Sequence, residues 1–183
     1  MAERQAATGA VANPQPARVV HWKQKLLAAR AQLREELSAR KSPRELLRRQ
    51  AAVVDRQLKE VWESHSIPRD VALAAVGGYG RGQLFPYSDV DLLILLSAPA
   101  DAVLARKIEE LLGTLWDIGI EVGHSVRTID ECVTLAAADV TVQTTLLEAR
   151  LLAGRRALYS RFVRRVSDAL DPAAFQQAKL LEQ

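Results

Sequence analysis

A glycine-rich segment followed by two aspartates is the most constraining feature of this sequence. Residues 77–91 read GGYGRGQLFPYSDVD, and the apolar run LLILL follows directly. Glycine lets the backbone approach a phosphate closely and offer amide donors to it. Side chains of a strand alternate between two faces, so Asp89 and Asp91 should point the same way. The segment therefore predicts a strand that opens with paired carboxylates beside a turn suited to phosphate.

The paired carboxylates predict a metal site. Two acids held side by side repel each other unless a cation lies between them, and Mg²⁺ prefers oxygen ligands and substrate phosphates. An isolated D-x-D could instead be a pair of solvated charges, but the preceding glycine turn favours a cleft. Asp89 and Asp91 are therefore expected to hold Mg²⁺, which would neutralise a triphosphate and stabilise leaving pyrophosphate.

The glycine turn supplies the candidate nucleotide-binding residues. Its glycines could simply form a tight turn, but their place between a strand and the aspartates favours phosphate contact. Arg81 could be an ordinary surface residue, or its forked guanidinium could bind phosphate oxygens. The expected nucleotide-binding residues are Gly77, Gly78, Gly80, Arg81 and Ser88.

Nucleotidyl transfer with two metals commonly uses a third acid, as a metal ligand or as a proton acceptor. Glu121 is the candidate, in a segment that reads as a strand over 120–127. Two other acids compete with it. Asp117 is expected at a helix end and Asp130 inside a helix capping box, so Glu121 is preferred as the third catalytic and metal-binding carboxylate.

Histidine, cysteine and tryptophan add no further site. His124 could be a ligand or a base, but beside valines a hydrogen-bonded core residue is expected. Cys132 is the only cysteine, which excludes an internal disulfide and a cysteine-based zinc site; it is expected to be buried and unreactive. Trp22, Trp62 and Trp116 are expected on the core faces of helices.

Hydrophobic periodicity predicts helices around a small sheet. Strands are expected at 71–76, 90–96 and 120–127. Helices are expected over 22–37, from the capping box at Ser42, over 104–115, from the capping box at Thr128, over 142–154, over 158–169 and over 175–183. The expected division is a disordered leader 1–18, N-terminal helices 19–66, a catalytic core 67–130 and a helical segment 131–183, truncated at its end.

Composition excludes several classes of protein. The 183 residues are 49% hydrophobic and 26% charged, as in a globular protein of one domain. No apolar run approaches the ~20 residues of a membrane span, and no hydrophobic signal core is present at the start, so a cytoplasmic protein without a membrane partner is expected. The net charge is only +3, with basic and acidic residues interspersed, which makes a nucleic-acid partner unlikely.

The motif resembles that of polymerase-β-type nucleotidyltransferases, and its fuller wording is similar to the bacterial protein-PII uridylyltransferase/uridylyl-removing enzymes. Two further blocks agree, LWDIGIEVGHSVRT at 115–128 and the segment from Asp139 to Gly154. Gln83 departs from the pattern, where an acid is expected. The resemblance implies an α/β (α+β) fold, with a small mixed sheet flanked by helices and followed by a helical segment.

The same resemblance implies Mg²⁺-dependent transfer of UMP from UTP to a tyrosine of the PII nitrogen-regulatory protein, with release of pyrophosphate. The histidine–aspartate clusters that the uridylyl-removing hydrolase needs are missing from these residues. Two alternatives stay open. The chain could be a related nucleotidyltransferase acting on another protein or a small molecule, or a non-catalytic fragment that binds nucleotide or a partner.

Overall fold

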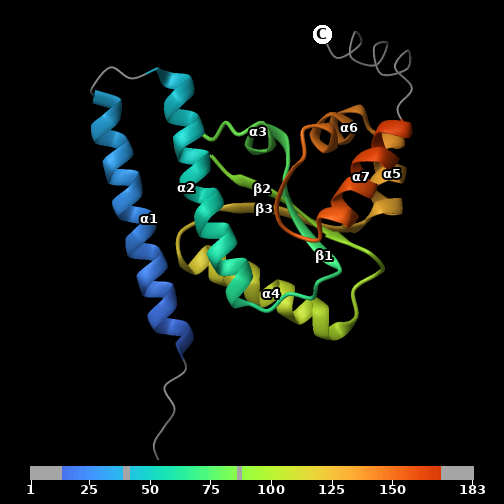
Figure 1. Cartoon of the computed structure of the whole chain (residues 1–183), viewed down its shortest axis with the longest axis horizontal. Coiled ribbons are helices and arrows are strands. Elements are labelled where there is room, and N and C mark those ends of the chain that lie inside the picture. The colour runs from blue at the N-terminus through green and yellow to red at the C-terminus, as the bar shows by residue number, and fades with distance from the viewer. Residues whose placement is uncertain (1–13, 39–41, 86–87, 170–183) are drawn as a thin grey trace, which may run out of the picture.

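The computed structural model of the chain describes residues 14–38, 42–85 and 88–169. A four-stranded sheet lies at the centre, with helices on both of its faces (Figure 1). The helices are α1 (Pro14–Ser38), α2 (Pro43–Ser64), α3 (Gly77–Gly80), α4 (Ala102–Asp117), α5 (Ile129–Ala138), α6 (Val140–Leu147) and α7 (Arg156–Asp168). The strands are β1 (Val71–Ala75), β2 (Val90–Leu96), β3 (Val122–Thr128) and β4 (Arg150–Gly154).

The sheet is mixed, with strand order β3-β2-β1-β4. Strand β2 runs antiparallel to β1 and parallel to β3, while β4 pairs antiparallel with the other edge of β1. Leu92 and Ile94 join the core under α1, α2 and α4, whereas Leu93 and Leu95 join the core under α5 and α7. The prediction of a central strand covered on both faces is therefore confirmed, and so is the α/β fold class.

The N-terminal helix begins earlier than expected. Helix α1 starts at Pro14, so the leader expected over 1–18 is wrong for residues 14–18; the remainder of that leader lies outside the described residues. Proline suits the first turn of a helix because its missing N–H would have no partner there. Trp22 is buried and Val19 half-buried against the core, and this packing supports the first turns of α1.

The end of the chain contains a strand that the periodicity did not predict. A helix was expected over 142–154, but α6 ends at Leu147 and β4 starts at Arg150. Strand β1 would otherwise leave one backbone edge unpaired, and β4 satisfies it with Ala75 opposite Arg150 and Ala72 opposite Gly154. The segment 131–183 is therefore not wholly helical; the helix expected over 175–183 lies outside the described residues.

Helix starts follow the capping signals only in part. The box predicted at Thr128 is present, with the Thr128 side chain accepting from the Glu131 amide and the Glu131 carboxylate accepting from the Thr128 amide. The box predicted at Ser42 is wrong, since the Ser42 side chain makes no capping hydrogen bond. The carboxylate expected to complete that box, Glu45, accepts from Arg49 instead.

The capping box should make stability depend on pH. Hydrogen bonds from the backbone and side chain of Thr128 lower the pKa of Glu131. A carboxylate with a lowered folded-state pKa stabilises the fold above its unfolded pKa of about 4.3, and this contribution disappears as pH falls through the folded-state pKa. Glu131→Gln is therefore expected to lower the melting temperature at pH 7 and to cause a smaller loss at pH 3. Thermal unfolding at both pH values checks this, with Glu109→Gln on the exposed face of α4 as the control; an equal loss at both pH values would contradict it.

Two aromatic predictions are wrong. Trp22 and Trp62 are buried as expected, but Trp116 is 53% exposed and lies edge-on to an exposed His124, with ring centroids 6.1 Å apart. Strand β3 is an edge of the sheet. The last turn of α4 therefore has no further strand to cover, and its tryptophan and the facing histidine remain at the surface.

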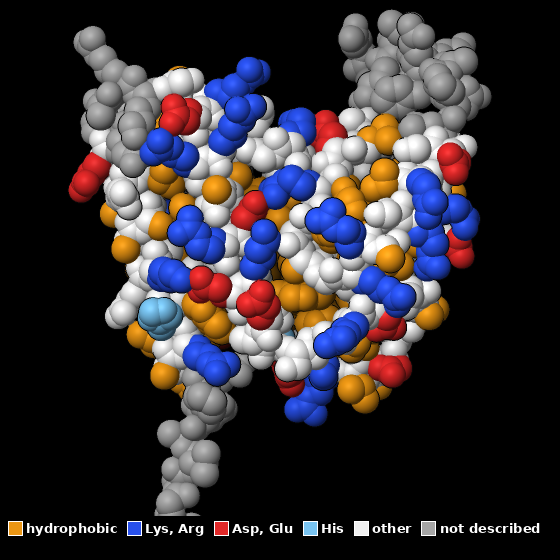
Figure 2. Space-filling view, viewed as in Figure 1, with side chains coloured by type: hydrophobic (Ala, Val, Ile, Leu, Met, Phe, Trp, Pro, Cys, Tyr) orange, Lys and Arg blue, Asp and Glu red, His pale blue; other side chains and the backbone are white. Residues whose placement is uncertain are grey.

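Cys132 is buried as predicted, and burial raises the pKa of its thiol to about 11, which keeps it protonated. None of the helices in the described part of the chain is long and apolar enough to cross a membrane. Basic and acidic side chains are interspersed over much of the face seen in Figure 2.

Candidate nucleotide and metal site

A cavity of about 270 Å³ lies where the glycine turn meets the start of β2. Its lining combines backbone-exposing glycine, a cation, a hydroxyl and two carboxylates. The lining residues are Gly78, Tyr79, Arg81, Gln83, Leu84, Phe85, Ser88, Asp89 and Asp91. Sequence reasoning expected Gly78, Arg81, Ser88, Asp89 and Asp91 at such a site, and the fold brings these five together.

The glycine turn is held against the two central strands by backbone hydrogen bonds. Val76 follows β1, and its amide donates to the Asp91 carbonyl over 3.0 Å. Its own carbonyl accepts from the Gly80 amide over 2.9 Å, which closes the short helix α3. Gly77 has a φ of +56°, a backbone conformation that residues other than glycine rarely adopt. The turn therefore reverses the chain directly beside Asp91.

Asp89 and Asp91 form the acidic part of the cavity. Burial, and then the negative charge of Asp89, raise the pKa of Asp91. None of the ion pairs between described residues includes either carboxylate. Two carboxylates that repel each other without a counter-charge are a donor set suited to a hard divalent cation such as Mg²⁺.

Glu121 does not join this pair. It is exposed just before β3, and its backbone carbonyl accepts from the Val90 amide over 2.8 Å. It is absent from the residues that line the cavity. Among the residues that the structure describes, no group of three or more His, Cys, Asp or Glu side chains is placed to hold a metal ion. The structure thus assembles two of the three expected acids, and the role of Glu121 stays a prediction.

The remaining predicted residues have distinct positions. Arg81 reaches the cavity but also forms an ion pair with Glu148, with 2.5 Å between Nη1 and Oε2. Gly77 lies next to the acids, since a Cβ added there would be 3.7 Å from Asp91 Oδ2. Gly80 is buried, and an added Cβ would be 2.1 Å from the Glu148 carbonyl oxygen, so the missing side chain allows close backbone packing. Its phosphate contact stays a prediction.

Comparison with known proteins identifies the family. The model of the family described as Nucleotidyltransferase domain matches residues 54–152. The chain belongs to the nucleotidyltransferase domain family. The described fold and the carboxylate pair agree with the resemblance of the motif to polymerase-β-type nucleotidyltransferases.

Relatives of this nucleotidyltransferase domain include long bacterial proteins. The bifunctional uridylyltransferase/uridylyl-removing enzyme of Chromobacterium violaceum is 48% identical over 163 residues, which cover 89% of this chain and 19% of that protein. The protein of the same name from Cupriavidus pinatubonensis is 53% identical over 137 residues, covering 75% of this chain and 16% of that protein. The chain spans less than a fifth of either relative. A solved structure of a mutant of the MntA-HpeT toxin–antitoxin aligns with a TM-score of 0.44 and 16% identity, over 70% of this chain and 96% of that chain.

Gly123 lies directly beside the candidate site, although sequence reasoning did not single it out. It lies opposite Asp91 in the parallel pairing of β2 with β3. A Cβ added to Gly123 would be 2.5 Å from Asp91 Oδ1. The missing side chain therefore makes room for the carboxylate. Only the parallel register, which no local pattern encodes, connects this glycine with the acid.

Gly123→Ala is accordingly expected to lower activity while sparing the fold. The clash falls on the end of a side chain, so Asp91 can rotate away, and the displaced carboxylate would no longer hold metal in its productive place. A misplacement of about 1 Å can cost on the order of 100-fold in rate. Transfer rates and melting temperature would be measured together, with Gly113→Ala in α4 as the control, where an added Cβ meets nothing within 4 Å. Undiminished activity in Gly123→Ala would show that Asp91 does not need this position.

Proposed function

We propose that this chain is a Mg²⁺-dependent uridylyltransferase domain that transfers UMP from UTP to a tyrosine hydroxyl of a PII-type nitrogen-regulatory protein. The observation that carries the proposal is the Asp89–Asp91 pair in a cavity beside the glycine turn. The name of the relatives, uridylyltransferase, at 48–53% identity supports the choice of UTP over other nucleotides. A cytoplasmic location, where UTP and such a signalling protein would both be present, belongs to the same proposal.

The proposed reaction is a single in-line substitution. The acceptor tyrosine oxygen forms a bond to the α-phosphorus, the bond from that phosphorus to the bridging oxygen of the β-phosphate breaks, and pyrophosphate leaves with the electron pair. Asp89 and Asp91 would bind Mg²⁺, which when bound neutralises the triphosphate and the leaving pyrophosphate. The proton of the tyrosine hydroxyl must move to a base, and Glu121 is the carboxylate proposed for it.

The other residues of the cavity would bind and orient the nucleotide. Gly77 and Gly78 present a backbone without side chains, which lets phosphate oxygens approach the turn. The forked guanidinium of Arg81 would pair with the triphosphate, in place of or together with its ion pair with Glu148. Ser88 adds a hydroxyl at the rim of the same cavity.

Thermal shift with each nucleoside triphosphate, with and without Mg²⁺, is the first test. A ligand at ~100 times its dissociation constant adds about 2.7 kcal/mol to stability. UTP with Mg²⁺ should stabilise the wild type selectively and leave Asp89→Ala unaffected. PII incubated with this chain, UTP and Mg²⁺ should then carry one added UMP on a tyrosine, which mass spectrometry would detect. Selective stabilisation by another nucleotide, or labelling of a small molecule alone, would replace the proposal with a related nucleotidyltransferase.

A further inference from the structure

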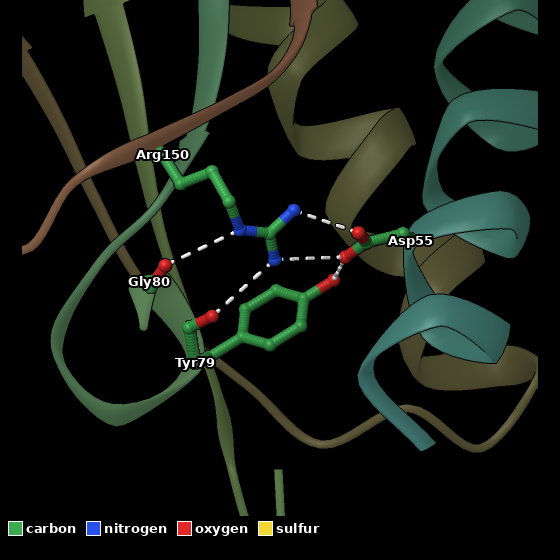
Figure 3. Close-up of polar contacts among 4 residues, drawn as sticks. All are labelled: Asp55, Tyr79, Gly80 and Arg150. Atoms are coloured by element: carbon green, nitrogen blue, oxygen red, sulfur yellow. Dashed lines mark hydrogen bonds and ion pairs between the residues drawn. The ribbon is translucent and has the colours of Figure 1, made fainter. Parts of the chain in front are cut away.

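The side chain of Arg150, which is distant from the glycine turn in sequence, contacts that turn. Arg150 begins β4 and forms a forked ion pair with Asp55 of α2, 95 residues away in sequence. The distances are 2.7 Å from Nη1 to Oδ2 and 3.1 Å from Nη2 to Oδ1. Figure 3 shows the guanidinium between the helix and the turn. This pair therefore ties β4 to α2 with defined geometry.

The same guanidinium also binds the backbone of the turn. Nε of Arg150 donates to the Gly80 carbonyl over 3.2 Å, and Nη2 donates to the Tyr79 carbonyl over 3.3 Å. The Tyr79 hydroxyl donates to Asp55 Oδ1 over 2.5 Å, and the guanidinium carbon lies 5.4 Å from the centre of the tyrosine ring. Asp55 and Arg150 thus hold both the main chain and the side chain of Tyr79 (Figure 3).

The surroundings make this contact strong. The Asp55 and Arg150 side chains are only 20% and 34% exposed, and Tyr79 is buried. Burial, together with the negative charge of Asp55, raises the pKa of Tyr79, so its hydroxyl stays protonated and remains a donor. A forked, charge-assisted ion pair that is partly buried contributes more stabilising free energy than an exposed ion pair.

The held residue is part of the nucleotide cavity. Tyr79 lines it together with Gly78, and the acids Asp89 and Asp91 form another part of its wall. The backbone around Gly78 can cradle phosphate only if its carbonyl groups are kept turned away from the anion. Arg150 binds the carbonyls of Tyr79 and Gly80 and so holds both groups toward its guanidinium.

We propose that Arg150, through Asp55 and Tyr79, is a positioning residue that keeps the glycine turn in the conformation that binds the triphosphate. The nucleotide part of this inference rests on the proposed function; the hold on the turn does not. Replacing both charges with apolar side chains of similar size often preserves stability. If the pair only stabilised the fold, such a double variant would therefore leave the turn and nucleotide binding unchanged.

The test uses the double variant Asp55→Leu/Arg150→Met, with hydrogen–deuterium exchange of the turn amides over 77–82 and UTP·Mg²⁺ titration as readouts. Arg150→Lys is the conservative variant, which keeps a charge for Asp55 but loses the fork. Thr114→Val is the matched control. It removes a part-buried hydrogen bond that joins α2 to α4 through His65, away from the turn.

In the double variant, exchange of the turn amides should accelerate by about tenfold, and the dissociation constant for UTP should rise by about tenfold, which corresponds to ~1.4 kcal/mol. Arg150→Lys should lie between, and Thr114→Val should change neither readout. Unchanged turn exchange in the double variant, or in Arg150→Lys if the double variant does not fold, would overturn the positioning role. If wild type binds no nucleotide, the proposed function fails, while the exchange experiment still decides whether Arg150 holds the turn.

Discussion

Alanine at Asp89 or Asp91 is expected to reduce UMP transfer by about a thousandfold, equivalent to ~4 kcal/mol in activation free energy. Each substitution removes half of the carboxylate pair that would hold Mg²⁺. The fold should be unaffected or slightly stabilised, because the pKa of Asp91 is raised by burial and by the charge of Asp89 and the pair gains nothing from its own proximity. Initial rates at saturating UTP, with melting temperatures measured on the same samples, check both parts.

The remaining acids provide the controls for this experiment. Asp117→Ala, exposed at the end of α4, should leave the rate unchanged. Asp130→Ala should affect stability alone, since Asp130 accepts from Arg165 on the protein surface over 2.9 Å. Glu121→Ala should lose activity if it is the third acid. Full activity in Asp89→Ala or Asp91→Ala would refute the two-carboxylate mechanism. Loss of activity in Asp130→Ala, with full activity in Glu121→Ala, would show that Asp130 and not Glu121 is the third catalytic acid.

The central part of the site could be predicted because its signals are local. Glycines, a pair of acids with period two and an apolar run follow one another within one short segment, and each has a direct backbone meaning. The order places a turn beside the mouth of a buried strand, where Asp91 is found. The fold on either side of β2 was predictable for the same reason, since Leu92 to Leu96 leave no polar face.

Contacts between distant segments could not be predicted. Strand β4 carries no alternation that separates it from the preceding helix, and only the open edge of β1 explains why Arg150–Gly154 is extended. The ion pair of Asp55 with Arg150 depends on that strand. Gly123 is significant only through its register with Asp91.

Exposure at the edge of the sheet was mispredicted for a related reason. Helical periodicity indicates which side of α4 faces the core, but it does not indicate how far the sheet extends beneath it. Trp116 and His124 meet at the edge strand β3, so both remain exposed. Strand order is a property of the whole fold, and the sequence pattern of one element does not contain it.

Gly80→Ala is expected to destabilise the domain by about 3 kcal/mol, the cost of forcing a side chain into packed backbone. The added Cβ would lie 2.1 Å from the Glu148 carbonyl oxygen and 3.1 Å from that of Ala75. Both neighbours are backbone, so no flexible side chain can move aside. The connection from α6 to β4 would have to shift; it contains Glu148, the partner of Arg81, and leads directly into Arg150. A fall of roughly 10 °C in melting temperature should result.

Gly78→Ala is the matched control, two residues earlier in the same turn. A Cβ there would be 3.6 Å from Arg81 Nη2 and 4.0 Å from the Gln83 carbonyl oxygen, which is ordinary contact. Its melting temperature should therefore stay near that of the wild type, even if a methyl group in the cavity wall weakens binding of UTP. Thermal unfolding without nucleotide, followed by UTP·Mg²⁺ titration, separates the two effects. Equal stability of Gly80→Ala and Gly78→Ala would contradict the close packing of Gly80 against the Glu148 backbone.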